Sequence, residues 1–101
     1  MKRLQQGDVI LDSCEMDLKD GEKLKHLILA EGEATGHHHQ IVSGVAALIM
    51  MKDKMFLKVM SDYAKLKHEE HNEINIPKDI YEIKRVREYD HFKEEAKRVA
   101  D

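Results

Sequence analysis

The stretch YAKLKHEEHNEINIPKDIYEIKRVREYD, residues 63–90, alternates apolar and polar side chains and predicts strands rather than a helix. Successive side chains of a strand point to opposite faces, so Leu66 and His68 share one face. Two turns are expected, one near residues 70–72 and one marked by Pro77 and Asp79. Beyond them, one face of the last strand collects five side chains: Tyr81, Ile83, Arg85, Arg87 and Tyr89.

Short apolar runs also mark the residues before this stretch. Strands are predicted at residues 8–12, in HLILAEG (26–32) and in HHHQIV (37–42). The polar residues 13–25 predict a loop with a turn at Asp20 and Gly21, and GEATG (32–36) predicts a second turn.

Residues 45–60 predict a β-hairpin, because the apolar runs VAALIMM and MFLKVM flank the polar KDK. A helix over residues 44–60 is the alternative, since Ala, Leu and Met are good helix formers. The tail DHFKEEAKRVA predicts a short helix with Asp90 as its N-cap. The predicted fold is therefore mainly β: a small single-domain β-barrel or sandwich over residues 1–101, with a short C-terminal helix.

Composition excludes several classes of protein. The 101 residues carry 17 basic and 20 acidic side chains, a net charge of -3, which argues against nucleic-acid binding. The N-terminal MKRLQQGDVILD has no long apolar run, so no signal peptide is expected, and no stretch is long enough for a spanning helix. One cysteine, Cys14, excludes an internal disulfide. A cytoplasmic protein without a membrane segment is expected.

Two histidine clusters, HHH at residues 37–39 and HEEH at residues 68–71, are the strongest chemical signal. On a strand His37 and His39 point the same way, which makes a two-point chelate. His68 and His71, three residues apart, converge only in a turn or a helix. Imidazole is a good ligand for divalent transition metals, with zinc the first expectation. The predicted metal ligands are thus His37, His39, His68 and His71.

Two carboxylates, Glu33 and Glu70, are candidates for a further ligand or a general base. The helical zinc motif H-E-x-x-H is absent, because HEEH spaces its histidines by three residues. The alternative is that these histidines are simply solvated or bind metal adventitiously.

Arg85 and Arg87 share a strand face, and two guanidinium groups suit a small anionic ligand such as a carboxylate or phosphate. The alternative is that both arginines pair with acidic residues on a solvated face. In the enzyme hypothesis, these arginines would hold the substrate while Glu33 or Glu70 acts as base.

The blocks QQGDVIL, AEGEATGHHHQI, HEEHNEINIP, YEIKRVREYD and VAD resemble a family of small proteins from bacteria, archaea and their viruses. The resemblance covers Gly7 to Asp101 and carries no established activity. It implies a shared pattern of residues: His37, His39, His68, His71, Arg85, Arg87 and Tyr89. The H-x-H pair also resembles the first motif of cupins, which are small β-barrels, although no glutamate follows His39 at the cupin spacing.

Three functions remain open at this point. The first is a metal-dependent enzyme that acts on a small anionic substrate. The second is a metal-free phosphodiesterase that uses histidine as acid and base and arginine to stabilise charge. The third is a non-catalytic accessory or interaction module, phage-associated or host-encoded, with a structural metal or none. An exposed strand edge in so small a sheet also predicts a homodimer as an alternative to a monomer.

Overall fold

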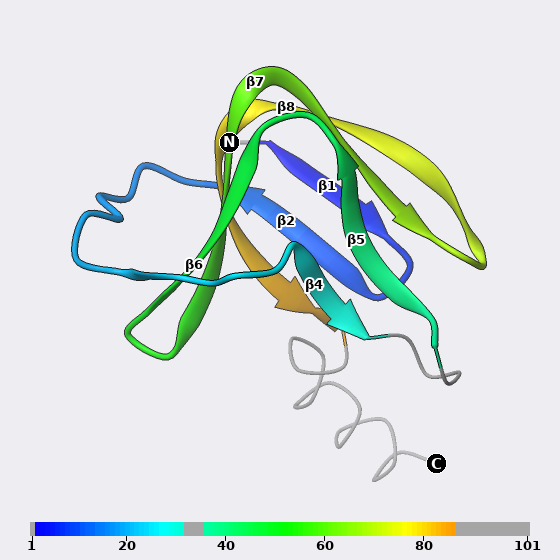
Figure 1. The fold of residues 1–101 in the computed structure, drawn as a ribbon, viewed down its shortest axis with the longest axis horizontal. Helices are drawn as coiled ribbons and strands as arrows, with labels where there is room; N and C mark the ends of the chain where they lie inside the picture. The colour runs from blue at the N-terminus through cyan, green and yellow to red at the C-terminus, as the bar shows by residue number, and fades with distance from the viewer. Residues whose placement is uncertain (1, 32–35, 87–101) are drawn as a thin grey trace, which may run out of the picture.

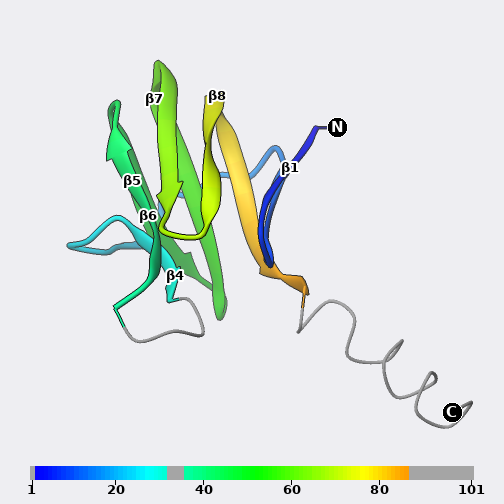
Figure 2. The same cartoon turned by 90° about the vertical axis from the view of Figure 1, so that its right-hand side faces the viewer.

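The computed structural model describes residues 2–31 and 36–86, which form one curled antiparallel sheet (Figure 1). The strand order is β1-β2-β8-β7-β5-β4, while β6 pairs with β7 and β3 pairs with β6. Seen from the side, the sheet curls into half a barrel, so the prediction of a mainly β fold is confirmed (Figure 2). The strands are β1 (Arg3–Gln6), β2 (Val9–Ser13), β3 (Glu22–Lys23), β4 (Ile28–Glu31), β5 (His38–Ser43), β6 (Ala46–Met51), β7 (Lys54–His68) and β8 (His71–Arg85).

The long hairpin of β7 and β8 organises the whole sheet. β7 pairs with β8 along its length, and its other edge is shared between β6 near the start and β5 near the end. Between Val59 and Tyr63 the register shifts, and β7 carries two more residues than β8. Such a bulge bends the strand and increases its twist. Because of the bend, β7 pairs with β6 near its start and with β5 near its end, and the sheet curls.

An apolar cluster fills the concave side of the sheet and includes Tyr81, which is fully buried. The hydroxyl of Tyr81 donates a hydrogen bond to the Pro77 carbonyl at 2.6 Å, so its polar atom is satisfied. Burial, and less strongly the charge of Asp79, raise the pKa of Tyr81 to about 12. The aliphatic part of the cluster is Val9, Leu11, Leu29, Ile41, Leu48, Leu57, Val59, Ala64, Leu66 and Ile76.

The hairpin predicted at residues 45–60 is confirmed, and the alternative helix over residues 44–60 is wrong. Its turn consists of Lys52 and Asp53, whose φ angles are 53° and 63°. Two central residues with positive φ match the right-handed twist of the strands they join. The strands predicted at residues 8–12, 26–32 and 37–42 correspond to β2, β4 and β5.

The turn predicted at Pro77 and Asp79 is wrong, because β8 runs through both residues. Pro77 lies next to the bulge, opposite Tyr63, and β2 pairs only with residues 81–85 of β8. Proline is tolerated at bulges and on unpaired edges, since it has no N–H to donate there. The short strands β1 and β3 were not predicted, and the turn expected at residues 70–72 instead consists of Glu69 and Glu70.

Some predictions lie outside the described residues. These are the C-terminal helix and most of the turn at residues 32–36. Within residues 2–31 and 36–86, no helix is long and apolar enough to cross a bilayer.

Candidate metal centre

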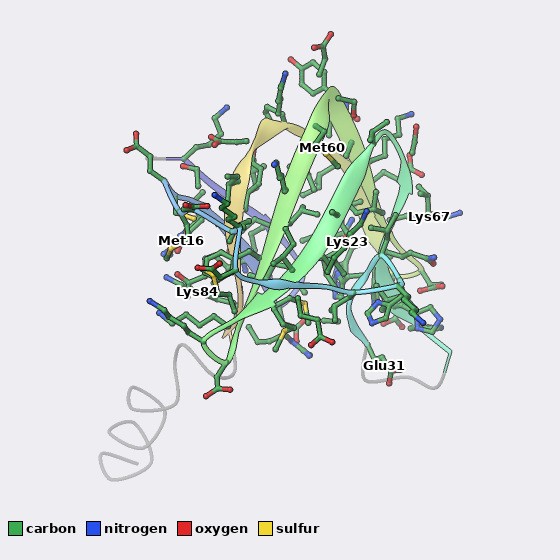
Figure 3. All side chains as sticks on the ribbon, turned by 60° about the vertical axis from the view of Figure 1, so that its left-hand side comes forward. Met16, Lys23, Glu31, Met60, Lys67 and Lys84 are labelled. Carbon is green, nitrogen blue, oxygen red and sulfur yellow. The ribbon has the colours of Figure 1, made fainter. Side chains whose placement is uncertain are left out.

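Three segments far apart in the sequence meet at one corner of the sheet: the β1–β2 turn, the start of β5 and the β7–β8 turn. Side-chain hydrogen bonds join all three, because Gln6 contacts both His39 and the backbone of Asn72, and Glu69 contacts the backbone of His38. Figure 3 shows nitrogen-bearing rings gathered in this region, between the labels of Lys67 and Glu31. The four histidines predicted as metal ligands all lie at this corner.

His68 and His71 flank the two-residue turn of the β7–β8 hairpin and are cross-strand partners. Their ring centroids are 4.8 Å apart. A spacing of three residues therefore brings two imidazoles together here, because the two turn residues place them opposite each other. His68 is buried, whereas His71 is exposed.

The second pair of histidines is His39 in β5 and His37, which directly precedes that strand. The His39 ring is 1% exposed and stacks on the His68 ring with a centroid distance of 4.2 Å. The His37 ring meets the His68 ring edge-on at 5.8 Å. His68 is therefore the ring that both histidines of the H-x-H pair contact. His38, between them, donates its backbone N–H to Glu69 Oε1 at 3.0 Å.

His37, His68 and Glu69 form a group whose potential ligand atoms all lie within 4.8 Å of one another. Ligands of a tetrahedral zinc ion are about 3.3 Å apart, given zinc–ligand distances of about 2.0–2.1 Å. A small inward shift would therefore close this group around an ion. Sequence reasoning named Glu70 and missed Glu69; the Glu70 carboxylate lies 3.8 Å from His37 Nδ1, at the rim of the group. The geometry of the turn decides which of the two adjacent glutamates joins His37 and His68, and the sequence does not specify that geometry.

The Nδ1 atom of His37 is buried and has no hydrogen-bond partner among the described residues. The same is true of His38 Nδ1. Burying a polar atom without a partner costs about 1–3 kcal/mol, so most proteins avoid it or use the atom for binding. His37 also belongs to the three-ligand group. Its unpartnered nitrogen could therefore bind a metal ion through its lone pair.

His39 is held by its own set of polar contacts. Its Nδ1 lies 3.0 Å from Gln6 Oε1, and its Nε2 lies 3.3 Å from Asp8 Oδ1. Burial and the neighbouring His68 lower the pKa of His39 to about 4, and Asp8 opposes that shift. His39 is therefore a neutral, enclosed ring near pH 7. Neither Gln6 nor Asp8 was singled out in the sequence, although both belong to the block QQGDVIL.

Arg85 is occupied by Asp8 rather than free to bind an anion. Its Nε donates to Asp8 Oδ2 at 3.0 Å, and its Nη2 contacts the same oxygen. Burial opposes ionisation of Asp8, but the hydrogen bonds and charge of Arg85 outweigh it and lower the pKa of Asp8. The alternative considered for the arginines, pairing with an acid, therefore describes Arg85 in this structure. Arg87, Tyr89 and Glu33 lie outside the described residues.

His71 packs against the β1–β2 turn. A Cβ placed on Gly7 would lie 2.5 Å from His71 Nε2, so only glycine leaves room for this ring. Gly7 also has a φ of 58°, a conformation that glycine adopts without strain. The contact joins His71 to the turn that carries Gln6 and Asp8. His71 is not part of the three-ligand group of His37, His68 and Glu69.

One described protein family matches the chain over residues 5–86, from the end of β1 to the end of β8. The chain belongs to this family. The family is a domain of unknown function, DUF8820, which agrees with the resemblance to small proteins without an established activity. Comparison with curated proteins and with solved structures found no match. The likeness to cupins thus gains no support, and the matched range contains every described residue of the histidine cluster.

Proposed function

We propose that the protein binds one divalent transition metal ion through His37, His68 and Glu69, at the junction of β5 and the β7–β8 turn. The observation that carries the proposal is the grouping of these three donors within 4.8 Å around a histidine with a buried, unpartnered nitrogen. The residues come from two segments that only the fold brings together.

The donor set suits zinc. Two imidazoles and one carboxylate are ligands that zinc accepts in proteins, with a fourth position left for water or another group. Non-haem iron uses the same donor types, so the ligands alone do not separate the two metals. The His37 side chain is 28% exposed and that of Glu70 is 64% exposed, so solvent can reach this corner. An ion here would therefore have access to an exchangeable fourth ligand.

Two existing hydrogen bonds involve the proposed ligand residues. Glu69 Oε1 accepts one from the His38 backbone N–H at 3.0 Å, which leaves the other carboxylate oxygen for an ion. His68 Nδ1 accepts a hydrogen bond from the Glu70 backbone N–H at 3.0 Å. Such a bond contributes about 0.5–1.5 kcal/mol, whereas structural zinc in small peptides binds with about 10–16 kcal/mol. The ion would outweigh the lost hydrogen bond, so this contact does not prevent loading.

Binding is better supported than catalysis. The anionic-substrate hypothesis relied on free arginines, and Arg85 is paired with Asp8. The metal-free phosphodiesterase hypothesis also needs arginine to stabilise charge, and the same ion pair with Asp8 occupies Arg85. A non-catalytic accessory protein that binds an ion requires no free arginine. This proposal includes a location in the cytoplasm and a monomer or a homodimer.

Metal content of untagged protein tests the proposal. Inductively coupled plasma mass spectrometry should find a stoichiometric transition metal in the wild type and a loss of that ion in His37→Ala. His26→Ala is the matched control, because His26 is an exposed histidine whose only described hydrogen bond is local, to the Ile28 backbone. If His37→Ala and His26→Ala both keep the ion count of the wild type, this site is refuted.

A further inference from the structure

Exposed apolar side chains gather where β7 bulges against the connection between β5 and β6, at the top of the view in Figure 1. Of the five large hydrophobic side chains that are exposed within residues 2–31 and 36–86, four lie here, between 39% and 59% exposed: Val42, Val45, Met60 and Tyr63. The Met60 backbone N–H donates to the Val45 carbonyl at 2.8 Å, which joins the two segments. These four residues are called the bulge patch. A grouping of this kind on a protein surface is typical of an interaction site.

Specific contacts hold the backbone of the bulge patch in place. Ser61 Oγ accepts a hydrogen bond from the Val45 N–H at 2.8 Å and donates one to the Tyr63 carbonyl at 2.7 Å. Gly44 has a φ of 95°, and a Cβ placed on it would lie 2.5 Å from the Tyr63 carbonyl oxygen, so the connection packs closely on the bulge. A bulge can redirect side chains in this way. A partner would therefore meet an ordered surface and lose less entropy on binding.

Three lysines of β7 extend the patch on both sides: Lys58 precedes Met60, and Lys65 and Lys67 follow Tyr63. All five side chains are exposed and alternate with buried core residues, so they share the outer side of the strand. The strand pairing places only uncharged residues opposite the lysines: Ala47 and Ile80 at Lys58, Ser43 and Asn75 at Lys65, and Gln40 at Lys67.

These lysines also lack acidic partners in the part of the chain that the structure describes. The lysines that form ion pairs there are Lys54 and Lys84, which lie elsewhere on the sheet. The outer side of β7 therefore combines an apolar centre with positive charge that the fold leaves uncompensated. An occupant that carries both apolar groups and carboxylates would complement it.

We propose that the bulge patch docks an acidic segment of another protein, whose apolar side chains pack on Met60 and Tyr63 while its carboxylates face Lys58, Lys65 and Lys67. An apolar centre with tyrosine and methionine, surrounded by a polar rim, is the usual anatomy of a protein–protein interface. Positive charge on the rim steers an acidic partner and excludes a basic one. The proposal does not depend on the metal centre.

The same residues fit other occupants less well. Asp62 is exposed within the bulge, between Met60 and Tyr63, and would repel the phosphates of a nucleic acid or a lipid surface. Lipid-binding clusters also use roughly four to eight basic residues, more than the lysines on this side of β7. A second copy docked through the same patch would bring two sets of lysines together, which is unfavourable.

An NMR titration of nitrogen-15-labelled full-length protein tests the proposal. The probe is a synthetic peptide of alternating glutamate and leucine, and its control has lysine in place of each glutamate. The acidic peptide should shift the amide resonances of residues 42–45 and 58–67, and the basic peptide should not. Tyr63→Ser should weaken binding by about fivefold or more, the effect of removing a central contact.

A pair of lysine variants tests the charge complementarity. Lys65→Gln should weaken binding of the acidic peptide and reduce its dependence on salt. Lys25→Gln is the matched control, because Lys25 is also exposed but lies in the connection between β3 and β4. Equal losses in the two variants would mean diffuse attraction to any lysine and would overturn the proposal.

Three further outcomes would also overturn it. The first is an acidic peptide that leaves the resonances of the patch in wild-type protein unchanged, a result that needs no variant to fold. The second is a footprint on the patch from phosphatidylserine vesicles or a single-stranded oligonucleotide in place of the acidic peptide. The third is a dimer of the wild type, seen by sedimentation velocity, that Tyr63→Ser dissociates, since a second copy would then occupy the patch.

Discussion

The amide of Gln6 illustrates how one residue sets the chemistry of another. Three hydrogen bonds converge on it, two from its nitrogen and one to its oxygen; the bonds to Leu66 and His39 are buried and the bond to Asn72 is partly buried. Replacement by leucine would keep the approximate volume but leave the carbonyls of Leu66 and Asn72 and the ring N–H of His39 without this partner. The position therefore tolerates few side chains besides glutamine.

Gln6→Leu should lower the free energy of unfolding by about 1–3 kcal/mol, because buried polar groups lose their hydrogen bonds. Urea unfolding followed by circular dichroism measures the change. Gln5→Leu is the control: Gln5 is exposed, and its amide contacts only the Gly7 carbonyl, which water can satisfy. Equal stability losses in the two variants would contradict the role given to Gln6.

The two glycines Gly7 and Gly36 offer a matched comparison. Both have positive φ, 58° and 82°, but an added Cβ would collide with His71 only at Gly7 and would meet nothing within 4 Å at Gly36. Gly36→Ala should therefore cost only the backbone term of roughly 1–2 kcal/mol. Gly7→Ala should cost more, since the His71 ring must also move.

A double-mutant cycle isolates this contact. His71→Ala in the Gly7→Ala background should recover the excess destabilisation measured by urea unfolding, because the collision is removed. If His71→Ala recovers nothing, the packing of the ring on this turn is not what makes glycine necessary.

Part of the site was predictable at this scale. The four histidines were identified because their type and spacing carry the signal. Gln6, Asp8 and Glu69 were not, because their roles depend on partners as far as 77 residues away in the sequence. A glutamine in a short polar strand gives no local sign that it will be 3% exposed.

At the scale of strands, Asp12 on β2 links its own strand to two others, β1 and β8. It accepts hydrogen bonds from Arg3 on β1, at 2.6 Å and 2.9 Å, and from Lys84 on β8, at 2.9 Å. The hydrogen bond from Arg3, followed by the contacts of Lys84, lowers the pKa of Asp12 against the opposing effect of burial. The carboxylate thus links the outer hairpin to the centre of the sheet.

Asp12→Asn should lower the unfolding free energy at pH 7 by about 1.5–3 kcal/mol, the range for hydrogen bonds to charged groups. Because the folded pKa is below the ordinary value of 3.8, the stabilisation is present above that value and is lost as pH falls through it and below. The difference between wild type and variant should therefore shrink below about pH 4. Urea unfolding at both pH values measures this, and a constant difference would contradict the assignment.

The elements were predictable where local pattern and tertiary structure agree. The apolar runs located the hairpin of β6 and β7, and alternation located segments of β8, which was predicted as two shorter strands separated by a turn. β1 was missed because RLQQ contains a single apolar residue, and its pairing with β2 comes from the turn at Gly7 and Asp8. Pro77 was misread because an unpaired stretch of edge accepts a residue that usually ends a strand.

At the scale of the whole molecule, the proposed ion would add a further link between the start of β5 and the β7–β8 turn, which the Glu69–His38 hydrogen bond already joins. A ligand that binds only the folded state stabilises it by about 2.7 kcal/mol at a free concentration 100 times Kd. About 1 kcal/mol shifts the Tm of a domain this small by about 4–8 °C.

Saturating zinc should therefore raise the Tm of metal-free wild type by about 10–20 °C. Differential scanning calorimetry measures the shift, and a chelator should reverse it. Magnesium at the same concentration should have little effect, since it prefers oxygen ligands. A zinc-induced shift of the same size in His37→Ala would assign the stabilisation to adventitious binding.

The ion pair between Asp8 and Arg85 spans 77 positions of the chain. During synthesis, the ribosome releases Asp8 long before Arg85 leaves the exit tunnel. The complete set of contacts at the corner that gathers the histidines therefore forms only after Arg85 has been translated, later than both histidine clusters. A fragment that ends before β8 would contain His37, His39 and His68 but would lack His71 and the pairing of β8 with β7 and β2.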